Sequence, residues 1–265
     1  MKRPITAILF FIVSTSLLYS QGEIDDSEKI FYRNERTFAA TLSSNGFAGN
    51  FRYAKRIDAF RKTTYEIGFA YIKHEKEYKI SYSSSPQLGG SFVFGKTNSL
   101  FTLRAGIGFQ KELFRKEDKG GISIRYFYNF GPSIGFQKPV YYDVIVSEMD
   151  SEGNYIQVRK TMKFESHITA VERKAPFYIG LDEISVVPGV YGKFGFTFEF
   201  SKNDRAFNAF ETGIVFDAYL KKVPIMANDQ NHWFFPAVFI SYRFGKIIDS
   251  QFTNRRSKVD ELLTD

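Results

Sequence analysis

The chain contains no cysteine, one tryptophan and three histidines among its 265 residues. Without a thiol it cannot form a disulfide scaffold, a zinc-thiolate site or a c-type haem attachment. A lipoprotein is excluded for the same reason, because no cysteine can carry the lipid. No two histidines have the spacing of metal ligands. We therefore expect no metal and no cofactor.

Long apolar runs are absent after the N-terminus. The one such run, Ile5 to Leu18, follows Lys2 and Arg3 and precedes a polar, acidic stretch from Gln21. This order is typical of a secretory signal peptide, and the run is shorter than the roughly 20 residues of a transmembrane helix. The sequence predicts a signal peptide over residues 1–20, cleaved after Ser20, and export of the chain beyond the inner membrane.

Aromatic residues are abundant, at 18 % of the chain, which excludes a disordered composition. Basic residues exceed acidic ones, 36 against 29. Removal of Lys2 and Arg3 leaves 34 − 29 = +5. This excess suits a surface that faces anionic lipid head groups. Nucleic-acid binding has no recognition motif behind it and conflicts with export, so we expect no nucleic-acid partner.

Two-residue alternation of apolar and polar side chains runs through the chain. Between residues 100 and 110 one face carries Phe101, Leu103 and Ile107, and the other carries Thr102 and Arg104. Such alternation predicts strands with one apolar face. We expect strands near 36–44, 47–56, 63–72, 90–96, 99–114, 121–136, 188–201, 207–221 and 233–245.

A bacterial barrel needs an even number of strands, so nine candidates must be reconciled. Eight result if 90–96 belongs to a longer neighbour, and ten if the long insertion contributes one. We favour eight. The fold class is then all-β, an antiparallel transmembrane β-barrel with one long loop or hairpin insertion. The alternative is a soluble exported β-protein, a sandwich or a lipocalin-like ligand-binding barrel, with its apolar face inside.

Three observations favour the membrane barrel. The expected strands are long, whereas strands of soluble sheets usually have about five or six residues. Aromatic side chains gather at strand ends, as in interfacial girdles. Glycines recur on the less apolar face, where they leave room for long charged side chains; they are Gly68, Gly106, Gly108, Gly195 and Gly213.

The less apolar faces also carry charges of both signs. In a barrel these charges line the lumen and must be paired, and an eight-stranded barrel is narrow enough to be filled by its own side chains. We predict a lumen charge network that consists of Arg52, Glu66, Arg104, Arg125, Lys193, Glu199, Glu211, Asp217 and Arg243. A selective path for a small solute is the alternative.

A second basic group is a candidate for lipid phosphates at one rim of the barrel. It consists of Lys55, Arg56, Arg61 and Lys62. A barrel enzyme that modifies lipid A would need a histidine with a serine and a carboxylate. His167 follows Glu165 and Ser166, but adjacency in sequence does not make a triad. We expect no catalytic residues.

The segment 147–185 is a polar insertion too long for a plain turn, and long loops are often functional. We expect a hairpin with strands 140–148 and 154–164 that projects from the membrane surface. Glu148, Asp150 and Glu152 alternate at its tip, but the twelfth position of a calcium loop would be Arg159.

A resemblance adds to these patterns. Tyr19-Ser20-Gln21, the stretch Gly120–Val146 and the closing strand VFISYRFGK resemble small outer-membrane β-barrel proteins of Bacteroidota-type bacteria. The likeness covers 36–245 and implies a Gram-negative cell envelope, with the barrel assembly machinery and outer-membrane lipid as partners. Many such barrels end on an aromatic residue, whereas here a tail follows Phe244.

The sequence thus predicts a signal peptide (1–20), an N-terminal segment (21–35), a barrel (36–245) and a polar tail (246–265). The function we expect is structural or partner-binding, through the long loop to an envelope protein partner. The alternatives are a small-solute channel or a lipid-modifying enzyme in the same barrel.

Overall fold

The computed structural model describes residues 33–81, 91–116, 120–150, 155–164, 171–202, 205–227 and 231–249. The predicted signal peptide, most of the N-terminal segment and the tail beyond residue 249 lie outside the described residues. The chain divides into two units, Met1–Phe31 and Tyr32–Asp265, and the description concerns the second. In its described part, no helix is long and apolar enough to cross a membrane.

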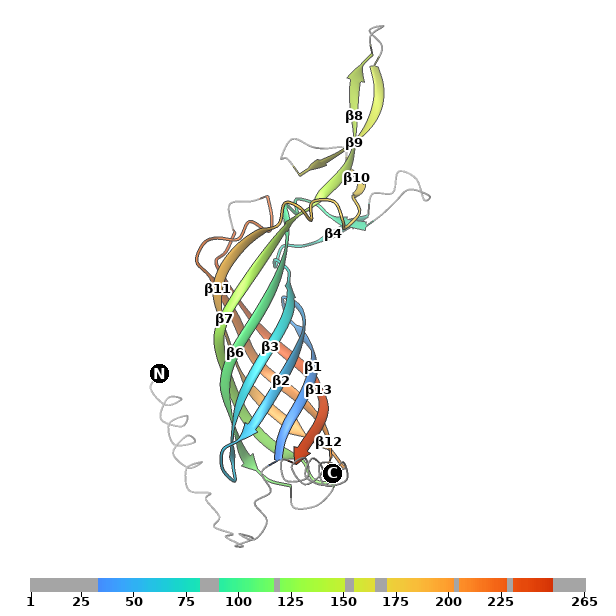
Figure 1. Ribbon diagram of the computed structural model, residues 1–265. Helices are drawn as coiled ribbons and strands as arrows, with labels where there is room; N and C mark the ends of the chain where they lie inside the picture. The colour runs from blue at the N-terminus through green and yellow to red at the C-terminus, as the bar shows by residue number, and fades with distance from the viewer. Residues whose placement is uncertain are drawn as a thin grey trace, which may run out of the picture. The chain divides into compact units, whose positions relative to one another are not determined.

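Eight long strands close into one antiparallel barrel (Figure 1). Around the barrel their order is β1-β13-β12-β11-β7-β6-β3-β2. Pairing of β1 with β13, which sets Phe38 opposite Phe244, closes the circle. The expected eight-stranded antiparallel barrel is confirmed. The strands are β1 (Arg33–Ser43), β2 (Gly46–Arg56), β3 (Arg61–Ile72), β6 (Asn98–Phe114), β7 (Ser123–Pro139), β11 (Ser185–Glu199), β12 (Ala206–Tyr219) and β13 (Phe234–Asp249).

The segment expected as a strand over 90–96 does not extend a barrel neighbour. Its residues form β5 (Ser91–Val93), which pairs only with β4 (Lys79–Ser81) in a separate two-stranded sheet. The barrel itself reaches past the expected limits of 36 and 245, since β1 begins at Arg33 and β13 ends at Asp249.

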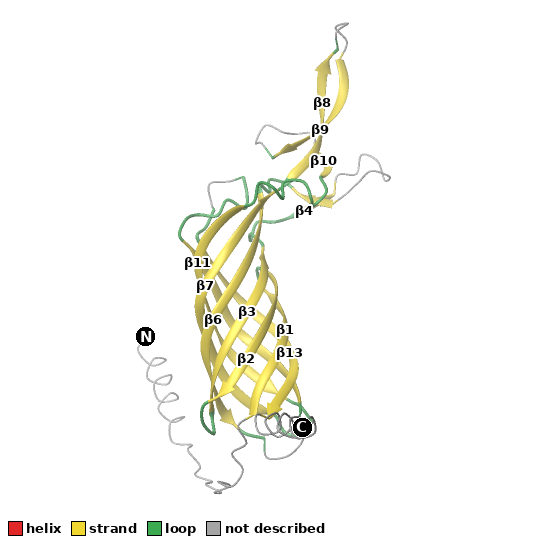
Figure 2. Cartoon of the chain, viewed as in Figure 1, coloured by secondary structure: helices red, strands yellow, loops and turns green. Residues whose placement is uncertain are grey.

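The long insertion folds into a three-stranded sheet. It contains β8 (Tyr141–Met149), β9 (Tyr155–Lys163) and β10 (Val171–Lys174) in the order β10-β8-β9. The expected hairpin corresponds to β8 and β9. The third strand, β10, was not expected, because its four residues are too few to show an alternation. Figure 2 shows that strands are the regular elements throughout the coloured part of the chain.

The two ends of the barrel differ in their connections. At one end, where β1 begins and β13 ends, the neighbouring strands are joined across 57–60, 115–122 and 200–205. At the other end lie the longer connections 73–97, 140–184 and 220–233. That end also holds the tight turn Ser44-Asn45, which joins β1 to Gly46 at the start of β2. Gly46 has φ +153°, and a Cβ there would collide with the Tyr71 carbonyl, which explains the glycine.

Burial along the strands is the reverse of that in a soluble protein. Along β13, Val238, Ile240 and Phe244 are 62 %, 57 % and 46 % exposed, while the alternate residues Ser241 and Arg243 are buried. The same phase runs around all eight strands. The barrel therefore presents an apolar outer surface and encloses its polar and charged side chains.

Candidate functional site

Five buried charges from five strands form one group inside the barrel, here called the central cluster: Arg52, Glu66, Lys193, Glu211 and Arg243. Glu211 Oε1 lies 2.7 Å from Arg52 Nη1 and 2.7 Å from Arg243 Nε. Glu66 Oε2 lies 2.7 Å from Arg52 Nη2 and 3.3 Å from Arg243 Nη2. Each side chain reaches the lumen because the residues beside it in sequence are apolar and point outward.

The central cluster has three cations and two carboxylates. Lys193 Nζ lies 3.5 Å from Glu66 Oε1 and 3.8 Å from Glu211 Oε2. It also lies 4.7 Å and 5.4 Å from the ring centroids of Phe239 and Phe127. The faces of these inward rings attract cations. The extra positive charge is thus held by two carboxylates and two aromatic rings.

A second group, here called the end cluster, lies at the end with the short turns: Glu35, Lys62, Lys116, Arg125 and Glu199. Arg125 Nη1 lies 2.9 Å from Glu35 Oε1, and Arg125 also pairs with Glu199. Lys62 pairs with Glu35, and Lys116 Nζ lies 3.1 Å from Glu199 Oε1. Two carboxylates are again shared by three cations.

A separate pair lies on the other side of the central cluster. Arg104 donates from Nε to Asp217 Oδ1 at 2.9 Å and from Nη2 to Asp217 Oδ2 at 2.5 Å. This two-pronged geometry is the strongest form of an ion pair. With it, all nine side chains of the predicted lumen network lie in the interior and are paired there.

Sequence reasoning missed Glu35, Lys62 and Lys116 as members of the interior. Lys62 was assigned to the basic rim group, but its side chain is buried against Glu35. The signal was present, because Lys62 is in phase with Thr64 and Glu66 along β3. Glu35 was missed because the strand was expected to begin one residue later.

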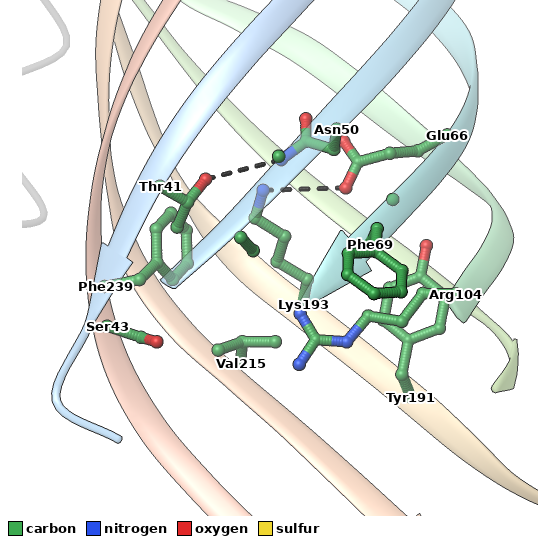
Figure 3. Close-up of a pocket in the computed structure, with 13 residues that line it drawn as sticks. Thr41, Ser43, Asn50, Glu66, Phe69, Arg104, Tyr191, Lys193, Val215 and Phe239 are labelled. Atoms are coloured by element: carbon green, nitrogen blue, oxygen red, sulfur yellow. Dashed lines mark hydrogen bonds and ion pairs between the residues drawn. The ribbon is translucent and has the colours of Figure 1, made fainter. Parts of the chain in front are cut away.

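Little space remains among these side chains. A cavity beside the central cluster is lined by Asn50, Glu66, Arg104, Tyr191 and Lys193, among others, and measures about 20 Å³ (Figure 3). That is room for about one water molecule. Asn50 Nδ2 donates to Thr41 Oγ1 across it, at 3.3 Å. At this level the side chains that line the cavity leave room for little else.

The end of the barrel with the long connections is closed by apolar packing. Val223 and Ile225, from the connection between β12 and β13, are fully buried against Ile72, Leu100 and Val187 of the strands. The Ile225 carbonyl accepts from the amides of Thr97 and Asn98 at 3.0 Å and 3.2 Å. This mouth plug lies in series with the charged clusters along the lumen.

The remaining residues of the basic rim group stay outside the lumen. Lys55 and Arg61 are exposed, and Arg56 Nε donates to the Asp58 carbonyl at 2.9 Å. The Asp58 carboxylate accepts from the amides of Phe60 and Arg61 at 2.9 Å and 2.8 Å. These hydrogen bonds hold the pKa of Asp58 below its usual value.

The three-stranded sheet has one apolar and one polar face. On the apolar face Tyr142, Val144 and Val171 pack with Phe92. On the polar face Asp143 accepts from Thr161 Oγ1 at 2.7 Å and from Arg173 Nε at 2.8 Å. Burial acts to raise the pKa of Asp143, but these two donors outweigh it and lower the pKa.

β9 is an edge strand of this sheet. It pairs with β8 on one side, and no described strand pairs with it on the other. Tyr155 at its start is 76 % exposed and Ile156 is 44 % exposed. An uncovered edge offers unpaired amides and carbonyls to another extended chain.

The histidines form no recognisable catalytic or metal site in the described residues. The rings of His74 and His232 stack with centroids 5.7 Å apart, and His232 Nε2 lies 3.9 Å from Glu75 Oε1. His167 lies outside the described residues. In the described part of the chain, no group of three or more potential ligands could hold a metal ion.

No family model and no curated protein matches the chain. Among solved structures it is similar to Ail, the attachment invasion locus protein of Yersinia pestis, with 5 % identity over 83 % of this chain and all of that one, at a TM-score of 0.39. It is also similar to Neisserial surface protein A, with 8 % identity over 81 % and 96 % of the two chains and a TM-score of 0.35. The N-terminal β-barrel domain of Pseudomonas aeruginosa OprF matches at 6 % identity over 80 % and 97 %, with a TM-score of 0.30.

Proposed function

We propose that this chain is an outer-membrane β-barrel protein of the Gram-negative cell envelope, and that it acts without catalysis. The observation that carries the proposal is the inverted distribution of side chains. Outward apolar residues of β13 run from Phe234 to Phe244. These ten steps cover about 33 Å of strand and, at a tilt of about 40°, roughly 25 Å of height, which matches the apolar band of such barrels.

The interior argues against the soluble alternative. A lipocalin-like barrel in water would keep its apolar face inside for a ligand. Here Phe194 and Phe196 are 48 % and 39 % exposed, whereas Glu211 is fully buried. In water the apolar outer surface of this barrel would stay exposed, which is unfavourable, whereas lipid would cover it. The filled lumen similarly favours a closed barrel over a small-solute channel.

The connections support an orientation. Outer-membrane barrels have short periplasmic turns and longer extracellular loops. The end with the turns 57–60, 115–122 and 200–205 then faces the periplasm, and the end with the three-stranded sheet faces outward. Export by the signal peptide over 1–20, reading of the last strand by the assembly machinery and a Bacteroidota-type source belong to the same proposal.

We propose that the outward three-stranded sheet binds a partner. This partner is an extended segment of an envelope protein, which pairs with the exposed edge of β9. Backbone pairing of this kind supplies affinity, and side chains along the edge supply selectivity. The exposed β9 edge is the observation that favours this role over a purely structural one.

Two measurements test the membrane assignment. The unheated folded chain should migrate differently from the heated chain on a denaturing gel, and it should fractionate with outer membranes. A chain that stays in the soluble fraction after cell breakage and shows no heat-dependent shift would contradict the proposal.

The partner role is tested by crosslinking in cells. A photo-reactive residue in place of Ile156 on the β9 edge should give a discrete protein adduct. The same residue in place of Ile240, which is outward on the barrel wall, is the matched control and should contact lipid. If both positions give the same products, or Ile156 gives none, β9 is not a docking edge.

A further inference from the structure

The outer surface of the barrel carries basic side chains in one region, at the end with the short turns. Five adjacent strands, β13, β1, β2, β3 and β6, each place one exposed cation there. We call these residues the basic arc. They are Lys246, Arg36, Lys55, Arg61 and Lys111.

Pairing of the strands brings like charges together in this arc. Arg36 lies directly opposite Lys246, and Arg61 lies directly opposite Lys111. Like charges at such positions destabilise a sheet unless something lies between them. An anion that bridges each pair would turn this repulsion into attraction.

Among the described residues, few anions lie near the arc. The carboxylate contact found within the described residues is that of Arg61 Nε with Asp58 Oδ2, at 3.8 Å. The acids on these strands, such as Glu35 and Glu66, are inward and paired in the lumen. The outward positions next to the arc are aromatic or apolar, and Arg36 lies 6.0 Å from the Tyr53 ring.

The arc has a fixed depth relative to the apolar band. Phe38, Phe244 and Phe109 lie two residues from Arg36, Lys246 and Lys111 on the same outward faces. Phe38 packs with Phe51 and Phe244 at centroid distances of 5.0 Å and 6.3 Å. Cations just beyond an aromatic girdle lie at the level of lipid head groups.

On the three remaining strands of the barrel, the described outward positions at this level lack this charge. On β7, β11 and β12 the outward residues near the short turns are Ile124, Phe198 and Asn208. At the opposite end of the five strands, the outward residues are mainly apolar, as with Leu42 and Phe47. On the outward strand positions the positive charge is therefore concentrated on one side of the barrel at this end, and the other exposed cations there, such as Lys202 and Arg205, belong to turns.

A hollow in the outer surface lies beside two cations of the basic arc. It lies between the β2–β3 turn and β7, measures about 380 Å³ and is lined by Arg61, Lys111, Phe109, Tyr126 and Tyr128 with Asp58. The Asp58 carboxylate already accepts from two amides of its turn. Two cations and an aromatic wall would suit a phosphate and the start of an acyl chain.

We propose that the basic arc binds the phosphates of anionic phospholipid head groups in the leaflet at the short turns. This rests on the proposed membrane function and adds a lipid class and a location to it. Arginine holds phosphate oxygens through two parallel hydrogen bonds, and lysine adds a point charge. Zwitterionic lipids share the phosphate but carry a cation that the arc repels.

The test uses the full chain reconstituted in zwitterionic phosphatidylcholine bilayers with a minority of phosphatidylglycerol. Association of nitroxide-labelled forms of each lipid is measured. Wild type should favour phosphatidylglycerol by at least about fivefold, the weight of one basic residue at an anionic surface. The variant Arg36→Gln, Arg61→Gln, Lys111→Gln, Lys246→Gln should lose most of this preference. Arg159→Gln with Lys160→Gln, exposed cations of β9, is the control and should keep it.

The leaflet is tested separately with single cysteine labels, which are site-specific because the chain has no cysteine of its own. A fluorophore on Thr63→Cys, beside the arc, should be quenched by nitroxide-phosphatidylglycerol more strongly than one on Leu42→Cys, at the other end. Equal quenching would overturn the assigned leaflet. Inorganic phosphate and chloride are then added at equal ionic strength. If phosphate abolishes the preference for phosphatidylglycerol and chloride does not, the arc is a site for free phosphate and the lipid assignment is overturned.

The two proposals fail in different ways. If the chain inserts and shows the heat-dependent shift but does not distinguish the lipids, the basic arc proposal is wrong and the membrane barrel stands. If the chain does not insert at all, the membrane function itself is wrong.

Discussion

Glu211 is the acceptor on which the central cluster depends. It is fully buried and contacts Arg52, Lys193 and Arg243. Replacing Glu211 by Gln keeps its size but leaves these cations with Glu66 alone. Breaking a buried ion pair in this way costs about 3–5 kcal/mol. We expect that loss in the free energy of unfolding, measured by urea titration of the lipid-reconstituted chain.

The matched control is Glu148→Gln on the hairpin. Glu148 pairs with Lys160, but both side chains are over 40 % exposed. Exposed pairs contribute about 0–1 kcal/mol, so this change should be nearly neutral. Equal effects of the two substitutions would show that the lumen cluster is not a stabilising element.

Asp143 should make the three-stranded sheet sensitive to acid. Its folded pKa lies below the unfolded value of about 3.9, because Thr161 and Arg173 donate to its carboxylate. Its stabilising contribution is present above the unfolded pKa and is lost as the pH falls through the lowered folded pKa. The protection factors of amides in β8 and β9, which correct for the slower intrinsic exchange in acid, should therefore fall from about pH 4 downward.

Asp143→Asn removes this titration. The variant should show faster exchange in the sheet at neutral pH and a smaller further change in acid. An unchanged acid response in the variant would assign the effect to other carboxylates, such as Glu183 beside Lys163.

The inward positions show how far single residues can be predicted. Alternation identified nine paired lumen charges because each lies in phase with apolar outward neighbours. The pairing itself could not be predicted, since Arg52 and Glu211 are 159 residues apart and meet only when the barrel closes. Lys62 was misplaced because its neighbour Arg61, which is outward, resembles it in charge.

Among the elements, the three-stranded sheet is separable from the barrel. β7 and β11 pair directly from Gln137 with Ser185 to Ser123 with Glu199, without help from β8–β10. Replacing 141–174 by a short Gly-Ser linker should leave the heat-dependent gel shift intact. Loss of the shift would mean that the sheet is needed for the barrel to close.

The same replacement should loosen the β4–β5 sheet. Phe92 is buried against Tyr142, at a centroid distance of 6.0 Å, and the Tyr142 hydroxyl lies 2.7 Å from the Val93 carbonyl. We expect faster trypsin cleavage between residues 73 and 97 in the linker variant. Tyr142→Phe keeps the ring and is the control for the packing contribution.

Long strands were predictable and short ones were not. Residues 99–114 and 121–136 are dominated by alternation and match β6 and β7 closely. β10 has four residues, too few to show a period, and pairs with β8 across an irregular register. β5 alternates like a barrel strand, but Gly95 with φ +76° and the turn around it separate it from β6.

At the scale of the whole molecule, side chains of different kinds occupy the lumen in succession. The mouth plug of Val223 and Ile225 is apolar, and the central and end clusters behind it are charged. The plug was not predictable from local sequence, because the connection 220–233 has no strand period and packs against the distant barrel strands β3, β6 and β11. A barrel with such barriers in series should not conduct ions.

Planar bilayer recordings should therefore show no stable conductance steps for the wild type. Replacing 221–232 by a Gly-Ser linker removes the plug but leaves Arg52, Glu66 and Arg243 across the lumen, so this variant should also stay closed. An added Arg52→Ala, Glu66→Ala, Arg243→Ala change removes three of the five charged side chains of the central cluster but leaves the end cluster behind them, so this variant should also stay closed if it keeps the heat-dependent gel shift. Conductance steps in the plug variant alone would show that the charges leave a path, and the solute-channel alternative would then replace the closed barrel.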